Sequence, residues 1–150
     1  MGQSAGKKGM IRTQIVKPIS LGTGTQVYEE SVIVPSVAKR LIGAIPIVIV
    51  YIPTVGETVT VLYRIDSQDT EPLNIEFASD PIMAPTGWGA NDHSIRVFMP
   101  QQLHEVSARF FRHQTVLRVQ MNCVKANTVA PLAGLQLLYE DSELSTNAGK

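Results

Sequence analysis

The residues that most often carry chemistry are sparse and widely separated in this chain. Its three histidines, His93, His104 and His113, stand nine or more positions apart. The ligands of a zinc or iron site commonly stand only a few residues apart on one element. The spacing therefore favours histidines that lie on the surface or make ordinary hydrogen bonds, and it predicts no metal ion and no other cofactor.

The sequence also gives little support for nucleophilic or acid–base catalysis. The single cysteine, Cys123, falls on the apolar side of an alternating segment, where burial makes a thiol a small, unreactive hydrophobe. A glycosidase needs two carboxylates facing each other across a cleft. Glu76 with Asp80 comes nearest, and Asp92 with His93 is the one adjacent carboxylate–imidazole pair. Because no nucleophile elbow, phosphate loop or dinucleotide fingerprint occurs, the sequence predicts a protein that is not an enzyme.

A stretch without periodicity, Ser79–Ser94, is long for a loop and holds the only tryptophan. Loops of that kind commonly carry function or are held by partners. Trp88 stands between two glycines, so its indole is a candidate for stacking on a sugar ring or for packing against a neighbouring subunit. The alternative is that Trp88 anchors the loop on its own domain, together with Ile82 and Met83. The candidate contact residues are Met83, Trp88, Asn91 and Asp92.

Positive charge is local, because thirteen basic residues balance thirteen acidic ones and the net charge is zero. That balance excludes a domain that attracts polyanions over its whole surface. The candidates for an anion or nucleic-acid contact are Lys7, Lys8, Arg12, Arg96 and Arg118. Arg96 and Arg118 form such a surface only if they project from adjacent strands. The alternative is a solvated face on which arginines pair with carboxylates, and the available partners are Glu57, Asp66 and Glu76.

Alternation with a period of two dominates the segments between these residues. In Glu57–Asp66, apolar residues share one side and threonines and an arginine share the other, which is typical of a β-strand with one buried side. The other segments expected to be strands are Met10–Val16, Thr25–Val34, Leu73–Phe77, Ser94–Met99, Thr115–Cys123 and Gly134–Tyr139.

The segment Ala44–Ile52 is apolar on both sides, as the central strand of a sandwich would be, and Pro46 is expected at its start, where no ladder donor is needed. The Val55–Gly56 step predicts a tight hairpin to the following strand. Val37–Leu41 is a candidate for one helical turn. Gln101–Phe111 fits a helical stripe and a strand, and both interpretations stay open.

Eight or nine strands, separated by Pro and Gly without a long helix, indicate an all-β fold: an antiparallel β-sandwich of the jelly-roll type. The chain of 150 residues is expected to hold a flexible basic N-terminal arm (1–9), one β-sandwich domain (10–140) and a polar C-terminal tail (141–150). No apolar run follows the first lysines, so we expect no signal peptide. The longest apolar run, Leu41–Ile52, is too short to span a bilayer.

The pattern as a whole resembles the single jelly-roll capsid proteins of icosahedral viruses. The likeness covers Met10 to Tyr139 and rests on the Gly/Lys arm at Gly6–Gly9, followed by strands with long loops between them; the strands that carry it include Ala44–Ile52, Glu57–Asp66 and Thr115–Cys123. The resemblance implies a structural protein without a catalytic site, which assembles in the host cytoplasm with copies of itself and other coat proteins into a virion. It also implies an arm that contacts neighbours or the genome, although two lysines are few for that role. The alternative is a carbohydrate-binding β-sandwich that uses the Trp88 loop.

Overall fold

The computed structural model describes residues 10–51, 57–67, 73–83, 96–98, 100–110 and 115–141. Within these ranges the chain forms eleven β-strands and no helix, which confirms the prediction of an all-β fold. The strands are β1 (Ile11–Ser20), β2 (Tyr28–Ile33), β3 (Ala38–Tyr51), β4 (Thr58–Val59), β5 (Val61–Ser67), β6 (Asn74–Ala78), β7 (Ile82–Met83), β8 (Arg96–Phe98), β9 (His104–Arg109), β10 (Val116–Cys123) and β11 (Leu132–Asp141).

The strand count exceeds the predicted eight or nine for two reasons. The predicted strand Glu57–Asp66 is interrupted at Thr60, so it becomes β4 and β5. The short β7 adds another strand, which pairs with β4 in a small two-stranded sheet. The open question over Gln101–Phe111 is resolved by β9, a strand that pairs with β3.

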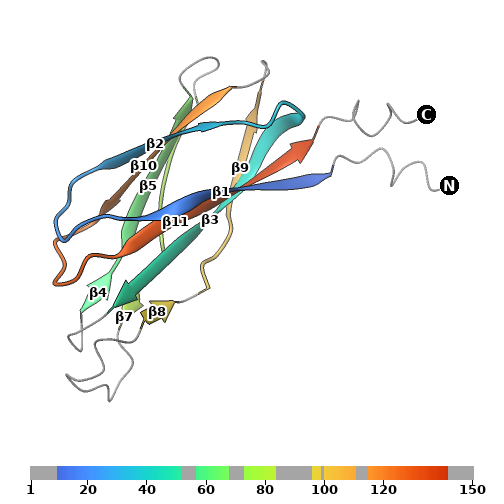
Figure 1. Cartoon of the computed structure of the whole chain (residues 1–150). Coiled ribbons are helices and arrows are strands. Elements are labelled where there is room, and N and C mark those ends of the chain that lie inside the picture. The colour runs from blue at the N-terminus through green and yellow to red at the C-terminus, as the bar shows by residue number, and fades with distance from the viewer. Residues whose placement is uncertain are drawn as a thin grey trace, which may run out of the picture.

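The two main sheets have the strand order of a jelly roll. One sheet runs β1-β11-β3-β8, with β9 also paired to β3, and the other runs β2-β10-β5-β6. The first strand therefore pairs with the last, β2 with β10, β3 with β8 and β9, and β5 with β6, and every one of these pairs is antiparallel (Figure 1). This nested pairing is that of one long hairpin rolled into a sandwich, so the predicted antiparallel β-sandwich is confirmed.

The tight hairpin predicted at Val55–Gly56 is wrong. β3 belongs to the five-stranded sheet and β5 to the four-stranded sheet, so the chain crosses from one sheet to the other between them. The residues of the link, 52–56, lie outside the described ranges. A short spacing predicts a hairpin only when both strands share a sheet; here the apolar sides of the two strands are buried against each other instead.

Two expectations about β3 are also wrong. The candidate helical turn Val37–Leu41 is a turn followed by strand: the Ala38 N–H donates to the Pro35 carbonyl at 3.0 Å, and β3 begins at Ala38. Pro46 lies inside β3 rather than at its start. On the side away from β11, β9 pairs as far as Ala44 and β8 begins at Ile49, and Pro46 falls in the gap between these pairings. A residue without an N–H is tolerated on a strand at such a gap.

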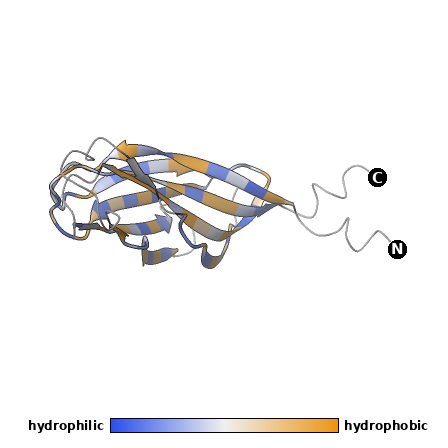
Figure 2. Ribbon diagram, turned by 90° about the horizontal axis from the view of Figure 1, so that it is seen from below, coloured by the Kyte–Doolittle hydropathy of each residue, from blue (hydrophilic) through white to orange (hydrophobic). Residues whose placement is uncertain are grey.

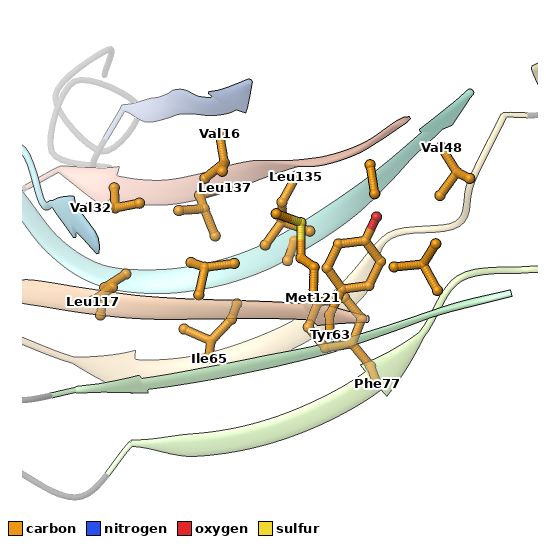
Figure 3. Packing of buried hydrophobic residues seen from close by; sticks show 14 of the residues in the cluster. Val16, Val32, Val48, Tyr63, Ile65, Phe77, Leu117, Met121, Leu135 and Leu137 are labelled. Carbon is orange, nitrogen blue, oxygen red and sulfur yellow. The ribbon is translucent and has the colours of Figure 1, made fainter. Parts of the chain in front are cut away.

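Inward-facing side chains of the two main sheets form one core. Leu135 and Leu137 of β11 point toward Leu117 and Met121 of β10 (Figure 3), and all four are fully buried. Alternation of apolar and polar residues along the strands produces this arrangement, and it is visible as alternating bands of colour in Figure 2. The period-two pattern of the sequence thus correctly identified the buried side of each of these strands.

Tyr63 links the two sheets through the core. It lies on the predicted apolar side of Glu57–Asp66, whose members are all fully buried: Val59, Val61, Tyr63 and Ile65. The Tyr63 hydroxyl crosses to the opposite sheet, where it donates to the Gly134 carbonyl at 2.8 Å and lies 3.3 Å from the Ile47 carbonyl. Burial raises the pKa of this phenol well above its usual range.

The edge formed by β1 and β2 is closed by polar side chains. The Tyr139 hydroxyl donates to Gln14 Oε1 at 2.6 Å, and Gln14 Nε2 donates to the Ile33 carbonyl at 3.0 Å. These two bonds connect β11, β1 and β2 in series. They hold the two edge strands together at a place where neither has a ladder partner on its outer side within the described residues.

Candidate functional site

Several predicted site residues lie outside the described ranges: Lys7, Lys8, Trp88, Asn91 and Asp92. The interpretations of the N-terminal arm and of the Trp88 loop therefore stay predictions. Met83, from the same predicted contact group, lies in β7 and is 56% exposed.

Arg96 and Arg118 do not lie on adjacent strands. Arg96 is in β8 of the five-stranded sheet, and Arg118 is in β10 of the four-stranded sheet. Periodicity could place each residue on a strand but could not pair the strands, since pairing depends on contacts between distant segments. The fold therefore does not bring these two arginines together on one sheet.

Arg118 instead belongs to a network of charges on the outward surface of the four-stranded sheet. Its Nε and Nη2 donate to the two carboxylate oxygens of Asp66 at 2.8 and 2.9 Å, and its Nη1 lies 3.9 Å from Glu29 Oε1. Arg64 Nε lies 3.7 Å from the same Asp66 carboxylate and donates to Asn74 Oδ1 at 3.1 Å. Hydrogen bonds from Arg118 to Asp66 raise the pKa of the guanidinium above its ordinary value. This arginine is already paired within the chain.

We call this outward surface of the four-stranded sheet the polar face. The polar residues on it are Glu29, Ser31, Arg64, Asp66, Asn74, Glu76, Arg118, Gln120 and Asn122. Four aliphatic residues, Ile33, Leu62, Ala78 and Val116, stand among them. Most of the polar side chains meet a partner of opposite charge or a hydrogen-bonding group on a neighbouring strand.

Arg12 is likewise paired, at the edge where the first and last strands meet. Its Nε and Nη2 donate to Asp141 Oδ1 and Oδ2 at 3.0 and 2.9 Å, and the hydrogen bonds raise the pKa of the guanidinium. Asp141 is the last residue of β11 and only 2% exposed, one residue beyond the predicted end of the domain. A long strand that continues the Tyr139 alternation explains why a carboxylate at this position is buried and paired.

The candidates for catalysis do not converge among the described residues. Burial raises the pKa of the Cys123 thiol, which lies in the core. Glu76 lies on the polar face opposite Arg64, and Asp80 bonds to Gln101 only through its backbone. His104 stacks on Phe77 with ring centroids 4.5 Å apart. Within the described ranges, no three His, Cys, Asp or Glu side chains lie close enough to hold a metal ion.

The feature that the sequence did not predict is the outward surface of the five-stranded sheet. Along β3, the buried Ala44, Val48 and Val50 alternate with half-buried isoleucines that point away from the core. The same alternation places leucines of β11 and isoleucines of β1 on this outward surface, which we call the apolar face. Its members are Ile11, Ile15, Ile42, Ile45, Ile47, Ile49, Leu103, Leu132 and Leu138.

Strand register sets these residues in rows across the sheet. Ile15, Gln136 and Ile45 form one row across β1, β11 and β3, and Leu132 stands opposite Ile49 in another. The half-buried members shield one another within the sheet, and no member of the apolar face packs against the core cluster. The sequence did contain the signal, because Ala44–Ile52 is apolar on both sides. A two-layer sandwich buries one side of each strand, so the other side of such a strand is left for something else to cover.

A shallow hollow of about 530 Å³ lies at the β9 margin of the apolar face. It is lined by Arg40, Ile42, Leu103, Glu105, Val106, Ser107 and Glu140. Arg40 and Glu140 pair with each other across β3 and β11, with Nε 3.1 Å from Oε1, so their charges cancel locally. At the opposite margin, on β1, Ile11 and Ile15 are 56% and 51% exposed. The apolar face therefore carries exposed aliphatic side chains at its β1 margin, which we call the raised margin, and a hollow at its β9 margin.

Comparisons with known proteins identify no family for this chain. No protein-family model matches the chain, and no curated protein matches it. Similar solved structures include dimeric latent PorU from Porphyromonas gingivalis, with a TM-score of 0.48 and 10% identity over 90% of this chain. They also include infectious bursal disease virus of the Gx strain, with a TM-score of 0.46 and 10% identity over 89%, and the VP2 subviral particle of that virus, with 0.42 and 7% over 87%.

This chain spans only 13% of the PorU chain and 33% of each of the two viral chains. At these identities and TM-scores, the similarities carry no argument about function. No helix long and apolar enough to cross a membrane occurs among the described residues.

Proposed function

We propose that this chain is a structural protein that assembles with copies of itself, and that the assembly is a viral capsid. The observation that carries the proposal is the apolar face: nine aliphatic side chains on one outward surface of a jelly roll, none of which packs against the core. A group of exposed and half-buried aliphatic side chains on one surface, with polar residues such as Gln136 among them, commonly marks a site of protein association. The polar face on the other side of the same sandwich shows that the fold itself does not require an apolar exterior.

The size of the apolar face supports association. β11 has ten residues, so the whole outward surface of the five-stranded sheet, with its polar residues included, is roughly 33 Å long and roughly 19 Å wide, or about 600 Å² per copy. If two copies covered this whole surface, the pair would bury about 1,200 Å², the size of a small specific interface.

Charge supports the same proposal. The net charge is zero and charged residues make up 17% of the chain, so many copies can pack together with little mutual repulsion. In this proposal the protein is not an enzyme, its partners are copies of itself and other coat proteins, and it resides in the virion after assembly in the host cytoplasm. The N-terminal arm, with Lys7 and Lys8, would contact neighbours or the genome.

The alternative function is carbohydrate binding through the Trp88 loop. Trp88, Asn91 and Asp92 lie outside the described residues, and no described contact favours this alternative. It stays a prediction that is separable from the proposal, because a sugar-binding module has no need to assemble.

The proposal is tested by size-exclusion chromatography with light scattering on the full chain, followed by negative-stain microscopy, over several salt and pH conditions. We expect species larger than the 16.4 kDa monomer, favoured by higher protein concentration and by ammonium sulfate, which strengthens apolar association. A strict monomer at high concentration under all conditions would contradict the proposal. A closed dimer that never assembles further would support self-association and exclude a shell.

A further inference from the structure

We infer that two copies of this chain pair through their apolar faces about a two-fold axis parallel to the strands, so that Ile11 and Ile15 of each copy fill the hollow beside β9 of the other. The inference rests on the proposed function and names the surface and the partner. It follows from the shape of the apolar face, from strand register and from the size of the surface.

Symmetry restricts how two identical sheet faces can meet. Homo-oligomers most often have two-fold symmetry, in which the same patch is used by both copies. Aligned face-to-face packing then allows two main arrangements. An axis perpendicular to the strands lays β1 over β1, whereas an axis parallel to the strands reverses the strand order and lays β1 of one copy over β9 of its partner.

The two margins differ in a way that favours the second arrangement. The β1 margin carries the exposed side chains Ile11 and Ile15, and the β9 margin carries the hollow of about 530 Å³. Laying β1 over β1 would set raised margin against raised margin and leave both hollows empty. Laying β1 over β9 places Ile11 and Ile15 of each copy at the hollow of the other, so the same contact forms twice in the pair. Shape complementarity of this kind is a property of specific interfaces.

Register places the two margins at the same height along the strands. Ile11 stands opposite Glu140, which stands opposite Arg40, a residue that lines the hollow. Thr13 is aligned through β11 and β3 with Glu105 of β9, another lining residue. Since an axis parallel to the strands preserves height, Ile11 falls over the hollow of the partner without any shift along the strand. Ile15, which is aligned with Ile45 of β3, falls at the end of the hollow, one residue beyond the last β9 pairing at Ala44.

Gly43 and Leu103 shape the apolar side of the hollow. A Cβ at Gly43 would collide with the side chain of Leu103, so the glycine lets Leu103 lie close over the sheet. Leu103 is nevertheless 47% exposed. An aliphatic side chain from a second copy would cover it.

A second copy fits this surface better than the remaining parts of the chain's own termini. Residues 1–9 and 142–150 contain few large apolar side chains, Met1 and Leu144 among them. Those segments lack the chemistry to cover nine aliphatic residues. A second apolar face offers the same chemistry, and two whole outward surfaces of about 600 Å² each would together reach the size of a small specific interface.

The first test compares two matched variants of the full chain. Ile15→Lys changes the raised margin of the apolar face, and Ile33→Lys changes an isoleucine of similar exposure on the other outward surface. We expect Ile15→Lys to weaken association at least about tenfold in sedimentation equilibrium, since each pair would lose two buried aliphatic side chains and would have to desolvate two ammonium groups. Ile33→Lys should leave the dissociation constant of the wild type unchanged. Thermal melts of both variants check that they fold, and the milder Ile15→Ser serves if Ile15→Lys does not.

The second test reports the orientation. Cysteines are placed at Thr13 and Ser107, which point outward from β1 and β9, and a short bifunctional maleimide is added. Cys123 is buried in the core and does not react. With the axis parallel to the strands, the double variant gives a covalent dimer and Thr13→Cys alone gives none.

The outcomes separate this inference from the proposed function. Assemblies that persist in Ile15→Lys, or that are lost equally in Ile33→Lys, overturn the inference and leave self-assembly standing. Covalent dimers from Thr13→Cys alone overturn the orientation, because they place β1 over β1. If Ile15→Lys melts at a markedly lower temperature as a monomer, another segment of the same chain covers the face, and the inference is wrong. A wild type that stays monomeric overturns both.

Discussion

On the outward surface of the four-stranded sheet, Arg118 holds Asp66 with hydrogen bonds of 2.8 and 2.9 Å, whereas the outward surface of the five-stranded sheet carries Ile45, Ile47 and Ile49 in corresponding mid-strand positions. Both surfaces are built from antiparallel strands whose inward side chains form one core, although the longest strands, β1, β3 and β11, belong to the five-stranded sheet. The chemical difference between the surfaces lies in the residues at the outward positions of the period-two pattern.

This difference shows what charged residues and aliphatic residues each contribute at the outward positions of a sheet. Ion pairs on a solvated sheet add little to the free energy of folding, but they satisfy each charged group locally and leave the surface without a need for a partner. Half-buried isoleucines on a sheet lose the remaining contact with water only when another surface covers them. The charged groups of the polar face are therefore satisfied without a partner, and the apolar face is the surface that the proposed association would use.

The largest effect on stability should come from destabilising the core, on which both outward surfaces depend. Burial raises the pKa of Tyr63 and of Tyr139 well above their usual range, while an unfolded tyrosine ionises near pH 10. Above that pH the unfolded state releases protons that the folded state keeps, so stability falls as the pH rises. At pH 11 we expect the free energy of unfolding to be lower than at pH 9, by on the order of 1 kcal/mol for each tyrosine.

Urea unfolding at pH 9, 10 and 11 measures this loss, with association and folding expected to disappear together. Tyr63→Phe is the control, since it removes one of the two phenols and should roughly halve the pH-dependent part. An unfolding free energy that is the same at pH 9 and pH 11 would contradict the burial of both hydroxyls.

A smaller effect is expected from a substitution on the polar face, which should change the free energy of unfolding but not self-association. Asp66→Asn removes the carboxylate that Arg118 and Arg64 share on the polar face. Because Arg118 is partly exposed, screening by solvent keeps the expected loss of unfolding free energy small, and below the loss at high pH. The dissociation constant for self-association should not change. Urea unfolding and sedimentation of the same sample check both statements, and Glu29→Gln is the control, since the exposed Glu29 lies 3.9 Å from Arg118 and should cost less. Weaker association in Asp66→Asn would mean that the polar face is also an interface.

The smallest effect on association is expected from a substitution of Trp88, which lies outside the described residues. Trp88→Ala should leave the dissociation constant unchanged if the apolar face is the contact surface, as measured by sedimentation. If the alternative function is right instead, the same variant should lose retention on a glycan affinity column while the protein behaves as a monomer. Loss of self-association in Trp88→Ala would show that the Trp88 loop, and not the apolar face, is the contact surface.

How far the fold follows from the sequence depends on the range of each interaction. The alternation in Glu57–Asp66 and Thr115–Cys123 fixed which side chains enter the core, because period two is a local property of an extended chain. The helical turn at Val37–Leu41 and the hairpin at Val55–Gly56 were wrong, since neighbours far along the chain decide whether a short segment extends β3 or changes sheet. Pro46 was misplaced for the same reason, because its tolerance depends on where β8 and β9 end.

The candidate site divides in the same way. The charges of Arg12 and Arg118 were visible in the sequence, but their partners, Asp141 and Asp66, lie 129 and 52 residues away along the chain. The isoleucines of β3 were also visible in the sequence, but their pattern predicted a central strand with both sides buried.

By itself, the sequence determined the all-β class and the two sides of each main strand, because both depend on the identity of residues one and two positions apart. Only the tertiary structure decided which strands pair, and therefore which outward sides combine into one surface. Strand pairing is settled by the burial of distant segments against one another. That is why nine aliphatic residues scattered between Ile11 and Leu138 became recognisable as one apolar face only after β1, β11 and β3 were placed side by side (Figure 1).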